Sequence, residues 1–241
     1  MLVLLPPSET KADGGDGPPL DLDALSYPEL TPTRRRLVDA LVAVAEDVPA
    51  SLKALGLTER QTAEVERNRM LPKAPTLPAL LRYTGVLYDA LDVGAMSRAE
   101  RRRAEARLAV GSALFGVVRG ADPVPAYRLS GGTVLPGLDP LRTLWRPVLG
   151  PALADTGLLI DLRSAAYAQL GAPEHAVTVR VVDGERRIAV SHFNKAHKGR
   201  LARMLATAPR VPSTVTGLLR TARNAGFRLE RTGERTLDLI V

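Results

Sequence analysis

The apolar positions of this chain form two kinds of strand pattern. Uninterrupted apolar runs bounded by prolines or polar residues predict short buried strands at residues 2–5 and 158–162. Alternating apolar and polar positions on either side of a turn predict two hairpins, which span residues 176–182 with 186–190 and residues 227–230 with 236–241.

Helical periodicity fills the segments between these strands. Apolar residues that recur every three to four positions predict helices over residues 33–48, 97–118, 194–208 and 213–224, with two shorter helices inside residues 51–71. The stretch at residues 141–149 holds the one tryptophan of the chain, Trp145, which we expect in the core. Strands at the start, middle and end of the chain, separated by helices, indicate an α+β (mixed α/β) fold. We expect one domain over residues 1–241, with a mixed sheet flanked by helices.

The two short helices are joined by the tight turn Leu55-Gly56-Leu57. Thr58 and Gln61 follow this turn in the spacing of a capping box, which marks the start of the second helix. A helix, a short glycine turn and a second helix outline a helix-hairpin-helix element, in which backbone N–H groups bind a DNA phosphate. An ordinary pair of antiparallel helices gives the same pattern, so both interpretations stay open.

The stretch S-H-F-N-K-A-H-K-G-R-L-A-R at residues 191–203 is rich in cations and contains no acid. On the helix that it opens, an apolar stripe of Leu201, Met204, Leu205 and Ala208 leaves basic side chains on the other face. These basic residues are Lys195, Lys198, Arg200 and Arg203. Cations at a helix N-terminus oppose the helix dipole, and a bound polyanion relieves that repulsion. A solvated basic face is the alternative.

Charge is unevenly distributed along the chain. Residues 1–96 hold 10 Lys and Arg against 14 Asp and Glu, whereas residues 97–241 hold 23 against 12, and the formal net charge is +7. The isoelectric point is about 10.1. A basic half of this kind is typical of proteins that bind phosphates.

Several classes of protein are excluded or disfavoured. The chain has no cysteine, which rules out disulfides and thiolate chemistry. The apolar run at the N-terminus is too short for a signal sequence, and no run approaches the roughly 20 residues of a membrane span. We therefore expect a soluble cytoplasmic protein without membrane contact.

The candidate chemistry favours anion binding over any one reaction. His192 and His197 are five residues apart with no acid nearby, so we expect no metal site, and nothing indicates a cofactor. Ser8 and Lys11 have the S-x-x-K spacing of penicillin-recognising enzymes, but the partner motifs of that class are missing. They fit better as a hydroxyl and an ammonium presented to an anion at the end of a strand. The Pro- and Gly-rich loop at residues 123–137 carries Tyr127 and Arg128 and is a candidate functional loop.

Five ordered sequence blocks resemble the YaaA-type peroxide-stress proteins. They read L-V-L-L-P-P-S-E-T-K (2–11), Y-T-G-V-L-Y-D-A-L (83–91), A-Y-R-L-S-G-G-T-V-L-P-G (126–137), L-I-D-L-R-S-A-A-Y (159–167) and S-H-F-N-K-A-H-K-G-R (191–200). The resemblance spans nearly the whole chain. It implies a single mixed α/β domain with a positively charged cleft and a helix-hairpin-helix element. It also implies binding of double-stranded DNA and survival of hydrogen peroxide, with less free iron and less oxidative DNA damage.

The resemblance also implies a set of functional residues. The recurrent cations of the family correspond to Lys11, Arg128, Lys195, Lys198 and Arg200, and its recurrent hydroxyls to Ser8, Tyr88, Tyr127, Ser164 and Tyr167. We expect a protein, monomeric by preference, that binds the DNA backbone through these cations and Arg203, with the turn at Gly56 as a second contact. Aromatic residues make up only 4% of the chain, which favours backbone contacts over base stacking. About five phosphate contacts predict a slope of log K against log salt near −4 to −5.

Two other functions stay open. An enzyme for a nucleotide or another phosphorylated small molecule would use a cleft lined by Arg128 and Lys195, with Ser8, Lys11, Ser164 and Tyr167 as candidate catalytic residues. A deep closed pocket under these side chains would favour that enzyme, and a broad open groove would favour DNA. The third possibility is a partner-binding module without a ligand of its own.

Overall fold

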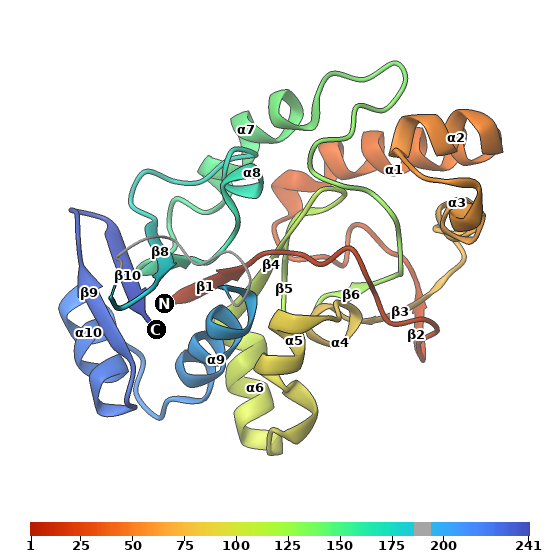
Figure 1. Ribbon diagram of the computed structural model, residues 1–241. Helices are drawn as coiled ribbons and strands as arrows, with labels where there is room; N and C mark the ends of the chain where they lie inside the picture. The colour runs from red at the N-terminus through yellow and green to blue at the C-terminus, as the bar shows by residue number, and fades with distance from the viewer. Residues whose placement is uncertain (186–193) are drawn as a thin grey trace.

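A twisted, mostly parallel sheet runs through the middle of the molecule (Figure 1). The computed structural model describes residues 1–185 and 194–241, whose main sheet has seven strands in the order β5-β4-β1-β7-β8-β10-β9. The inner strands run parallel to one another and are β4 (Leu108–Ser112), β1 (Leu2–Leu5), β7 (Leu159–Asp161), β8 (Val177–Val182) and β10 (Thr236–Ile240). The edge strands β5 (Gly116–Arg119) and β9 (Arg228–Arg231) are antiparallel to their neighbours. The carboxyl ends of the inner strands therefore lie along one edge of the sheet.

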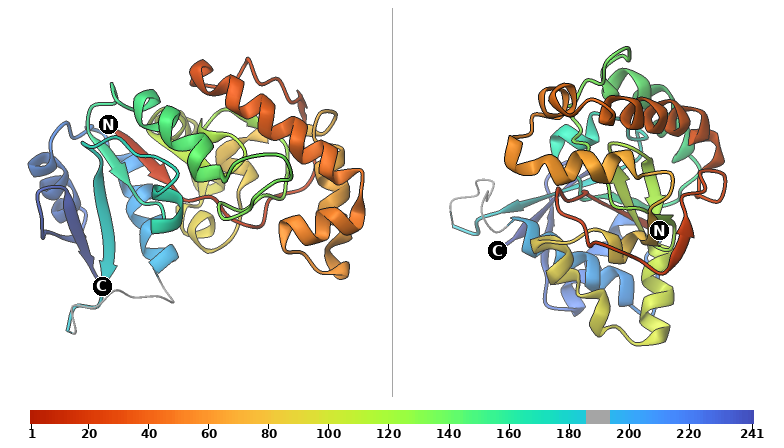
Figure 2. Two further views of the ribbon diagram at one scale, coloured as in Figure 1. Left: turned by 90° about the horizontal axis from the view of Figure 1, so that it is seen from above. Right: turned by 90° about the vertical axis from the view of Figure 1, so that its right-hand side faces the viewer.

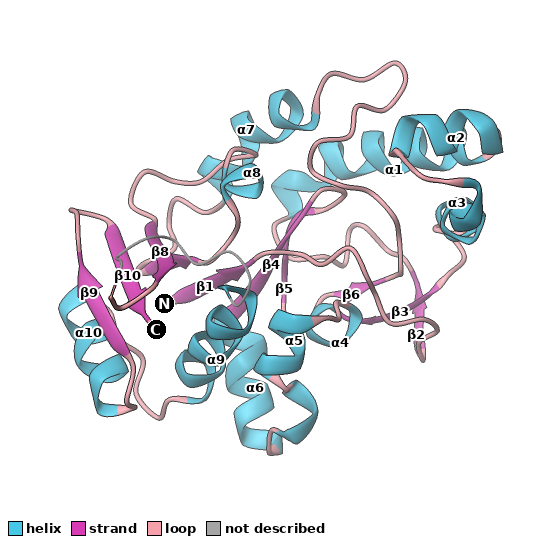
Figure 3. Ribbon diagram, in the orientation of Figure 1, coloured by secondary structure: helices cyan, strands magenta, loops and turns pink. Residues whose placement is uncertain are grey.

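Helices cover both faces of this sheet (Figures 1 and 3). One layer contains α5 (Val86–Leu91), α6 (Arg98–Arg107), α9 (Asn194–Thr207) and α10 (Val215–Asn224). The opposite layer contains α1 (Thr31–Ala45), α7 (Leu141–Ala152) and α8 (Ala165–Ala168). Strands β1 and β4 are buried along their whole length because both of their faces are covered, which explains their uninterrupted apolar sequences. Trp145 of α7 is fully buried and donates its indole N–H to the carbonyl of Ala113.

The remaining elements lie beyond one end of the sheet (Figure 2). They include α2 (Val48–Leu55), α3 (Thr62–Arg69), α4 (Ala79–Arg82) and a small second sheet of β2 (Gly17–Pro19), β3 (Pro75–Pro78) and β6 (Pro123–Val124). The described residues also form three short 3₁₀ helices: η1 (Pro28–Leu30), η2 (Glu59–Gln61) and η3 (Val93–Ala95). None of the helices in the two described segments is both long and apolar enough to cross a membrane.

The chain reverses its direction of travel across the sheet at β1. It passes from β1 to β4 on one side, with α6 packed against both strands, and then crosses to β7 on the other side of β1 after forming α7. In open α/β sheets such a switch point leaves a crevice at the carboxyl ends of the strands, where ligands bind. The segments that follow β1, β4 and β7 are therefore the first place to look for a site.

Most of the elements expected from the sequence are present. The mixed α/β class, the strands at the start of the chain and near residue 160, and the C-terminal hairpin of β9 and β10 are confirmed. The first half of the other expected hairpin is β8, and its second half at residues 186–190 lies outside the described residues. The two helices around Gly56 are also present as α2 and α3.

The long helix expected over residues 97–118 is wrong in its second half. Helix α6 ends at Arg107, and the apolar run that follows forms the antiparallel strands β4 and β5. Gly116 has a φ of +73°, which a side chain would disfavour, and it lies at the start of β5 after the turn. The run is apolar on both faces because it enters the centre of the sheet, and periodicity does not distinguish such a strand from a buried helix.

Candidate functional site

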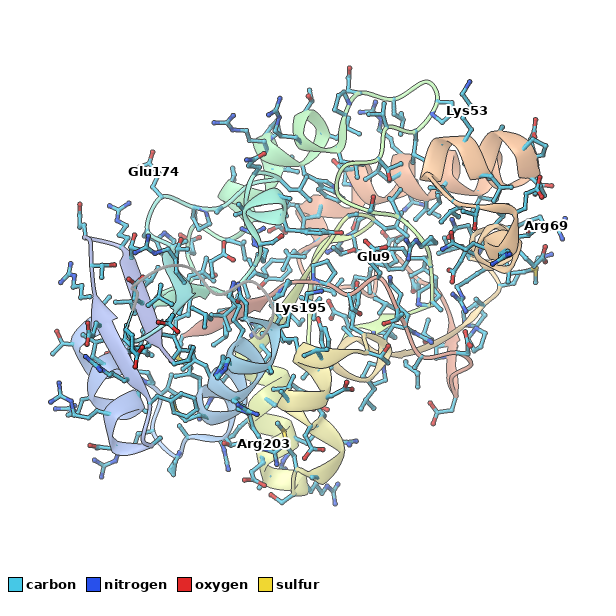
Figure 4. All side chains as sticks on the ribbon, viewed as in Figure 1. Glu9, Lys53, Arg69, Glu174, Lys195 and Arg203 are labelled. Carbon is cyan, nitrogen blue, oxygen red and sulfur yellow. The ribbon has the colours of Figure 1, made fainter. Side chains whose placement is uncertain are left out.

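Residues far apart in the sequence meet at the carboxyl edge of the sheet, around the end of β1. The segment after β1 carries Ser8 and Lys11, and the segment after β7 leads to Ser164 and Tyr167. The loop after β6 supplies Tyr127 and Arg128, while α9 approaches with its first turns. In Figure 4 the labelled side chains of Glu9 and Lys195 lie near the centre of the molecule, whereas Lys53 and Arg69 lie at its far end.

Lys11 is the cation of this edge whose pKa is shifted furthest from its ordinary value. Its ammonium nitrogen is 4.2 Å from the ring centroid of Tyr127 and 5.3 Å from that of Tyr83. It donates hydrogen bonds to the backbone carbonyls of Ser8 at 3.1 Å and Glu9 at 3.5 Å. A bridge between the backbones of Lys11 and Tyr83 fixes the chain at this point. Burial lowers the pKa of Lys11 to about 7, and the nearby carboxylate of Glu9 opposes this effect only in part.

The tyrosines expected as site hydroxyls fall into two groups. Tyr127 and Tyr88 are buried, and their hydroxyls bind other groups of the interior. The Tyr127 hydroxyl lies 2.9 Å from that of Tyr83 and 2.7 Å from that of Ser112. The Tyr88 hydroxyl donates to the carbonyl of Pro6. Burial raises the pKa of Tyr88 and of Tyr127 well above the usual value, so both stay protonated. These phenols fix the ends of β1 and β4 under the site.

Tyr167 is half-buried and closer to the surface. Its hydroxyl accepts a hydrogen bond from the backbone N–H of Gly131 at 3.1 Å. Burial and the nearby carboxylate of Glu9 raise the pKa of Tyr167 to about 12. Ser164 is exposed at the start of α8, and Ser8 donates to the carbonyl of Thr10 while accepting from the N–H of Thr84. Neither serine has a histidine or lysine nitrogen as a hydrogen-bond partner among the described residues, so no activated serine is seen.

Arg128 is held at both its backbone and its side chain. The amide of Asn68 on α3 accepts from the N–H of Arg128 at 2.7 Å and donates to its carbonyl at 2.8 Å. The Arg128 guanidinium forms an ion pair with the Glu9 carboxylate at 2.6 Å. Arg128 and Glu9 both act electrostatically on Lys11 and Tyr167, so these four side chains form one cluster.

The cations of α9 divide into an inner and an outer pair. Lys198 is buried and donates to the carbonyl of Leu162 just after β7, and Arg203 binds the carbonyl of Leu91 and the carboxylate of Asp92. Lys195 and Arg200 are exposed, and within the described residues neither has an ion-pair partner. The contact of Lys198 with Leu162 anchors the first turns of α9 at the carboxyl edge.

The helices around Gly56 border this site through α3. Gly56 has a φ of +63° and ends α2, and the N–H of Leu57 returns to the carbonyl of Leu52. Beyond η2, α3 carries Asn68, which holds Arg128. Two short helices follow one another through a tight glycine turn and η2; a helix-hairpin-helix element that binds DNA through backbone N–H groups stays a prediction.

Sequence reasoning missed two acidic residues of this edge. Glu9 neutralises Arg128, and Asp161 forms a buried ion pair with Arg163 at 2.7 Å. The signal for Glu9 was its place between Ser8 and Lys11 in the block after β1. The pair of Asp161 and Arg163 was present in the block L-I-D-L-R-S, where a charged pair ends a buried strand.

Three surface hollows are seen among the described residues, and none of them is lined by Lys11 or Arg128. A groove of about 830 Å³ runs between the end of α9 and α10, with Arg210 and Arg220 at its wall. Smaller hollows of about 290 Å³ and 230 Å³ are lined by residues of α3 and of the loop near Gly131. Within the described residues no group of three or more His, Asp or Glu side chains is placed to hold a metal ion.

Comparison with known proteins gives one consistent family. The family model described as "Peroxide stress protein YaaA" matches residues 1–232. A UPF0246 protein of Corynebacterium efficiens is 50% identical over 252 residues, which cover the whole of both chains. A UPF0246 protein of Corynebacterium glutamicum is 46% identical over the whole of both chains. A third, from Streptomyces coelicolor, is 44% identical and covers 95% of this chain and 92% of its own length.

Proposed function

Because this chain belongs to the family of the peroxide stress protein YaaA, we propose that it acts in the peroxide-stress response by binding double-stranded DNA in the cytoplasm. Binding of this kind would shield DNA from oxidation and accompany a lower level of free iron. The observation that supports it is the exposed pair of Lys195 and Arg200 on α9, in two helical turns that contain no acid. Exposed, unpaired cations beside the carboxyl edge suit a phosphate backbone.

The contacts of the other cations reduce the number available to DNA. Lys198 and Arg203 are bound to backbone carbonyls, and Lys11 is half-buried against tyrosine rings. Lys195 and Arg200 remain, and Arg128 joins them if a phosphate displaces Glu9. Two to three phosphate contacts give a slope of log K against log salt of about −2 to −3, shallower than the slope expected from five.

A fluorescence-anisotropy titration of a short DNA duplex at several salt concentrations tests this proposal. The double variant Lys195→Ala/Arg200→Ala should reduce the magnitude of the slope by about 2. The matched control is Arg142→Ala/Arg146→Ala, which removes two exposed cations from α7 on the opposite face of the sheet and should leave the slope unchanged. Equal losses in the two double variants, or a wild-type slope near zero, would overturn the proposal.

A second candidate is an enzyme for a nucleotide or another phosphorylated small molecule. The supporting observation is the cluster of Lys11, Arg128, Glu9 and Tyr167 at the switch point of the sheet, with an amine whose pKa is lowered to about 7. A thermal-shift screen of nucleotides and sugar phosphates tests this candidate, because a ligand at a hundred times its Kd stabilises the folded chain by about 2.7 kcal/mol. A chain whose melting temperature responds to none of these ligands at millimolar concentration would remove it.

A further inference from the structure

The Lys11 amine has the surroundings of a nucleophile. Its hydrogen bonds to the carbonyls of Ser8 and Glu9 use two N–H groups, and a neutral amine in this position keeps its lone pair for attack. The residue is half-buried and not sealed within the core. The Tyr127 ring, 4.2 Å away, stabilises any cation formed at this nitrogen.

Arg128 provides an anion site next to this amine. In the structure the guanidinium is paired with the Glu9 carboxylate, at 2.6 Å between Nη2 and Oε2. The Glu9 side chain is 56% exposed and the Arg128 side chain 22% exposed. A pair as exposed as this contributes only about 0–1 kcal/mol, so a ligand anion can replace Glu9 at small cost. Asn68 holds the Arg128 backbone independently, so the guanidinium keeps its position when Glu9 leaves.

We propose that Lys11 forms an imine with a small aldehyde or ketone that carries an anionic group, carboxylate or phosphate, bound by Arg128. The neutral amine nitrogen attacks the carbonyl carbon, both of its protons pass to the carbonyl oxygen, and that oxygen leaves as water while the C=N bond forms, with no change of oxidation state. This inference rests on the second proposed function and defines its chemistry; it is independent of DNA binding.

The protonation state of Lys11 agrees with this chemistry. Burial lowers the pKa of the amine to about 7, so about half of it is neutral at neutral pH, whereas an ordinary lysine is almost fully protonated. The charged and titratable groups that face the amine are Glu9, Arg128, Glu64, Arg67, Tyr83 and Tyr127. The protonated imine would again be a cation above the Tyr127 ring.

Reductive trapping on the full-length chain tests the proposal. The protein is incubated at pH 7.5 with cyanoborohydride and one of three probes: glyoxylate, glycolaldehyde phosphate or neutral glycolaldehyde. The hydride reduces any imine to a stable secondary amine, and peptide mass spectrometry then compares the five lysines of the chain, which are Lys11, Lys53, Lys73, Lys195 and Lys198. We expect labelling of Lys11 to exceed that of the exposed Lys53 and Lys73 at least about tenfold, because so little of an ordinary lysine is neutral at this pH.

The anionic probes separate the two parts of the proposal. They should label Lys11 about tenfold faster than glycolaldehyde, which is the value of one charged hydrogen bond to Arg128, and whichever labels faster identifies the anionic group. Arg128→Gln should remove this preference while glycolaldehyde still labels Lys11. Uniform labelling of the lysines overturns the imine, and equal rates for charged and neutral probes overturn the role of Arg128.

The same experiment distinguishes this inference from the function on which it rests. If the protein binds a nucleotide or sugar phosphate in the thermal-shift screen but shows no selective labelling, the imine proposal is refuted and the second candidate function is retained. If Lys11 is labelled selectively but the protein does not bind DNA, this inference is retained and only the DNA proposal is refuted. Because trapping is measured on the wild-type protein, it does not depend on a Lys11 variant that folds.

Discussion

Replacing Gly199 with alanine tests how closely α9 must approach α5. A Cβ atom built at Gly199 lies 2.8 Å from the Cβ of Ala90 and still closer to the carbonyl oxygen of Leu87, which belongs to the backbone of α5. Ordinary contact begins near 3.4 Å, and neither neighbour is a flexible side chain that can move aside. The two helices therefore have to separate to admit one methyl group.

Two effects of opposite sign act on this substitution. Alanine in place of glycine inside a helix contributes about 1 kcal/mol of stability through helix propensity. Overpacking of a closed interface costs typically about 1–3 kcal/mol, and here the backbone contact puts the cost at the upper end. The expected net effect is a loss of about 2 kcal/mol, which lowers the melting temperature by about 4–8 °C for a domain of this size.

Gly150→Ala is the matched control in another helix. Its nearest tertiary neighbour would be the carbonyl oxygen of Ala172 at 3.7 Å, an ordinary contact. Pro151 follows it and disfavours a helical residue with a Cβ, which offsets the propensity gain of up to about 1 kcal/mol, so we expect little change in stability. Differential scanning calorimetry of both variants beside the wild type checks that only Gly199→Ala lowers the melting temperature substantially. A Gly199→Ala protein that melts at or above the wild-type temperature would refute the close packing of α9 on α5.

Two further predictions concern the buried charges of the carboxyl edge. Asp161→Ala leaves the Arg163 guanidinium, 2% exposed, without its carboxylate, so urea unfolding should show a loss of about 3–5 kcal/mol; a loss below 1 kcal/mol would mean that the pair is not buried in solution. Burial lowers the pKa of Lys11 from 10.5 to about 7, so between these pH values the unfolded chain binds more protons than the folded one, and stability rises with pH. Relative to Lys11→Met, the wild type should therefore gain stability from pH 7 to pH 10 in urea titrations; a constant difference between the two proteins would contradict the shifted pKa.

The sequence predicted elements better than it predicted boundaries between helix and strand. The run at residues 2–5 has prolines after it and reads as a strand in any context, and β1 lies there. The run after Arg107 follows a true helix without a proline or a charged residue, so its apolar pattern extended the helix. Only its position between covered faces makes it β4, and that is a property of the whole fold.

For the candidate site too, the sequence predicted which residues take part better than it predicted their contacts. Ser8, Lys11 and Ser164 were expected from short motifs and from the family resemblance, and the structure places them after β1 and β7, whose carboxyl ends lie at one edge of the sheet. The partners of each cation could not be found in this way. Whether Lys198 contacts solvent or the carbonyl of Leu162 depends on how far α9 slides along the sheet, which sequence spacing does not determine.

These partners divide the basic edge into two chemically different layers. The inner layer holds Lys11 and the pair of Arg128 with Glu9, where burial weakens the charge of the amine and an internal carboxylate occupies the guanidinium. The outer layer holds Lys195 and Arg200, which are exposed and unpaired among the described residues. Binding of a polyanion requires exposed positive charge, and salt weakens it. Imine formation with a carbonyl ligand requires an uncharged amine, so a higher pH favours it. One surface can therefore serve both, because DNA lying over α9 does not require the Lys11 amine and a small anion at Arg128 does not require the outer cations.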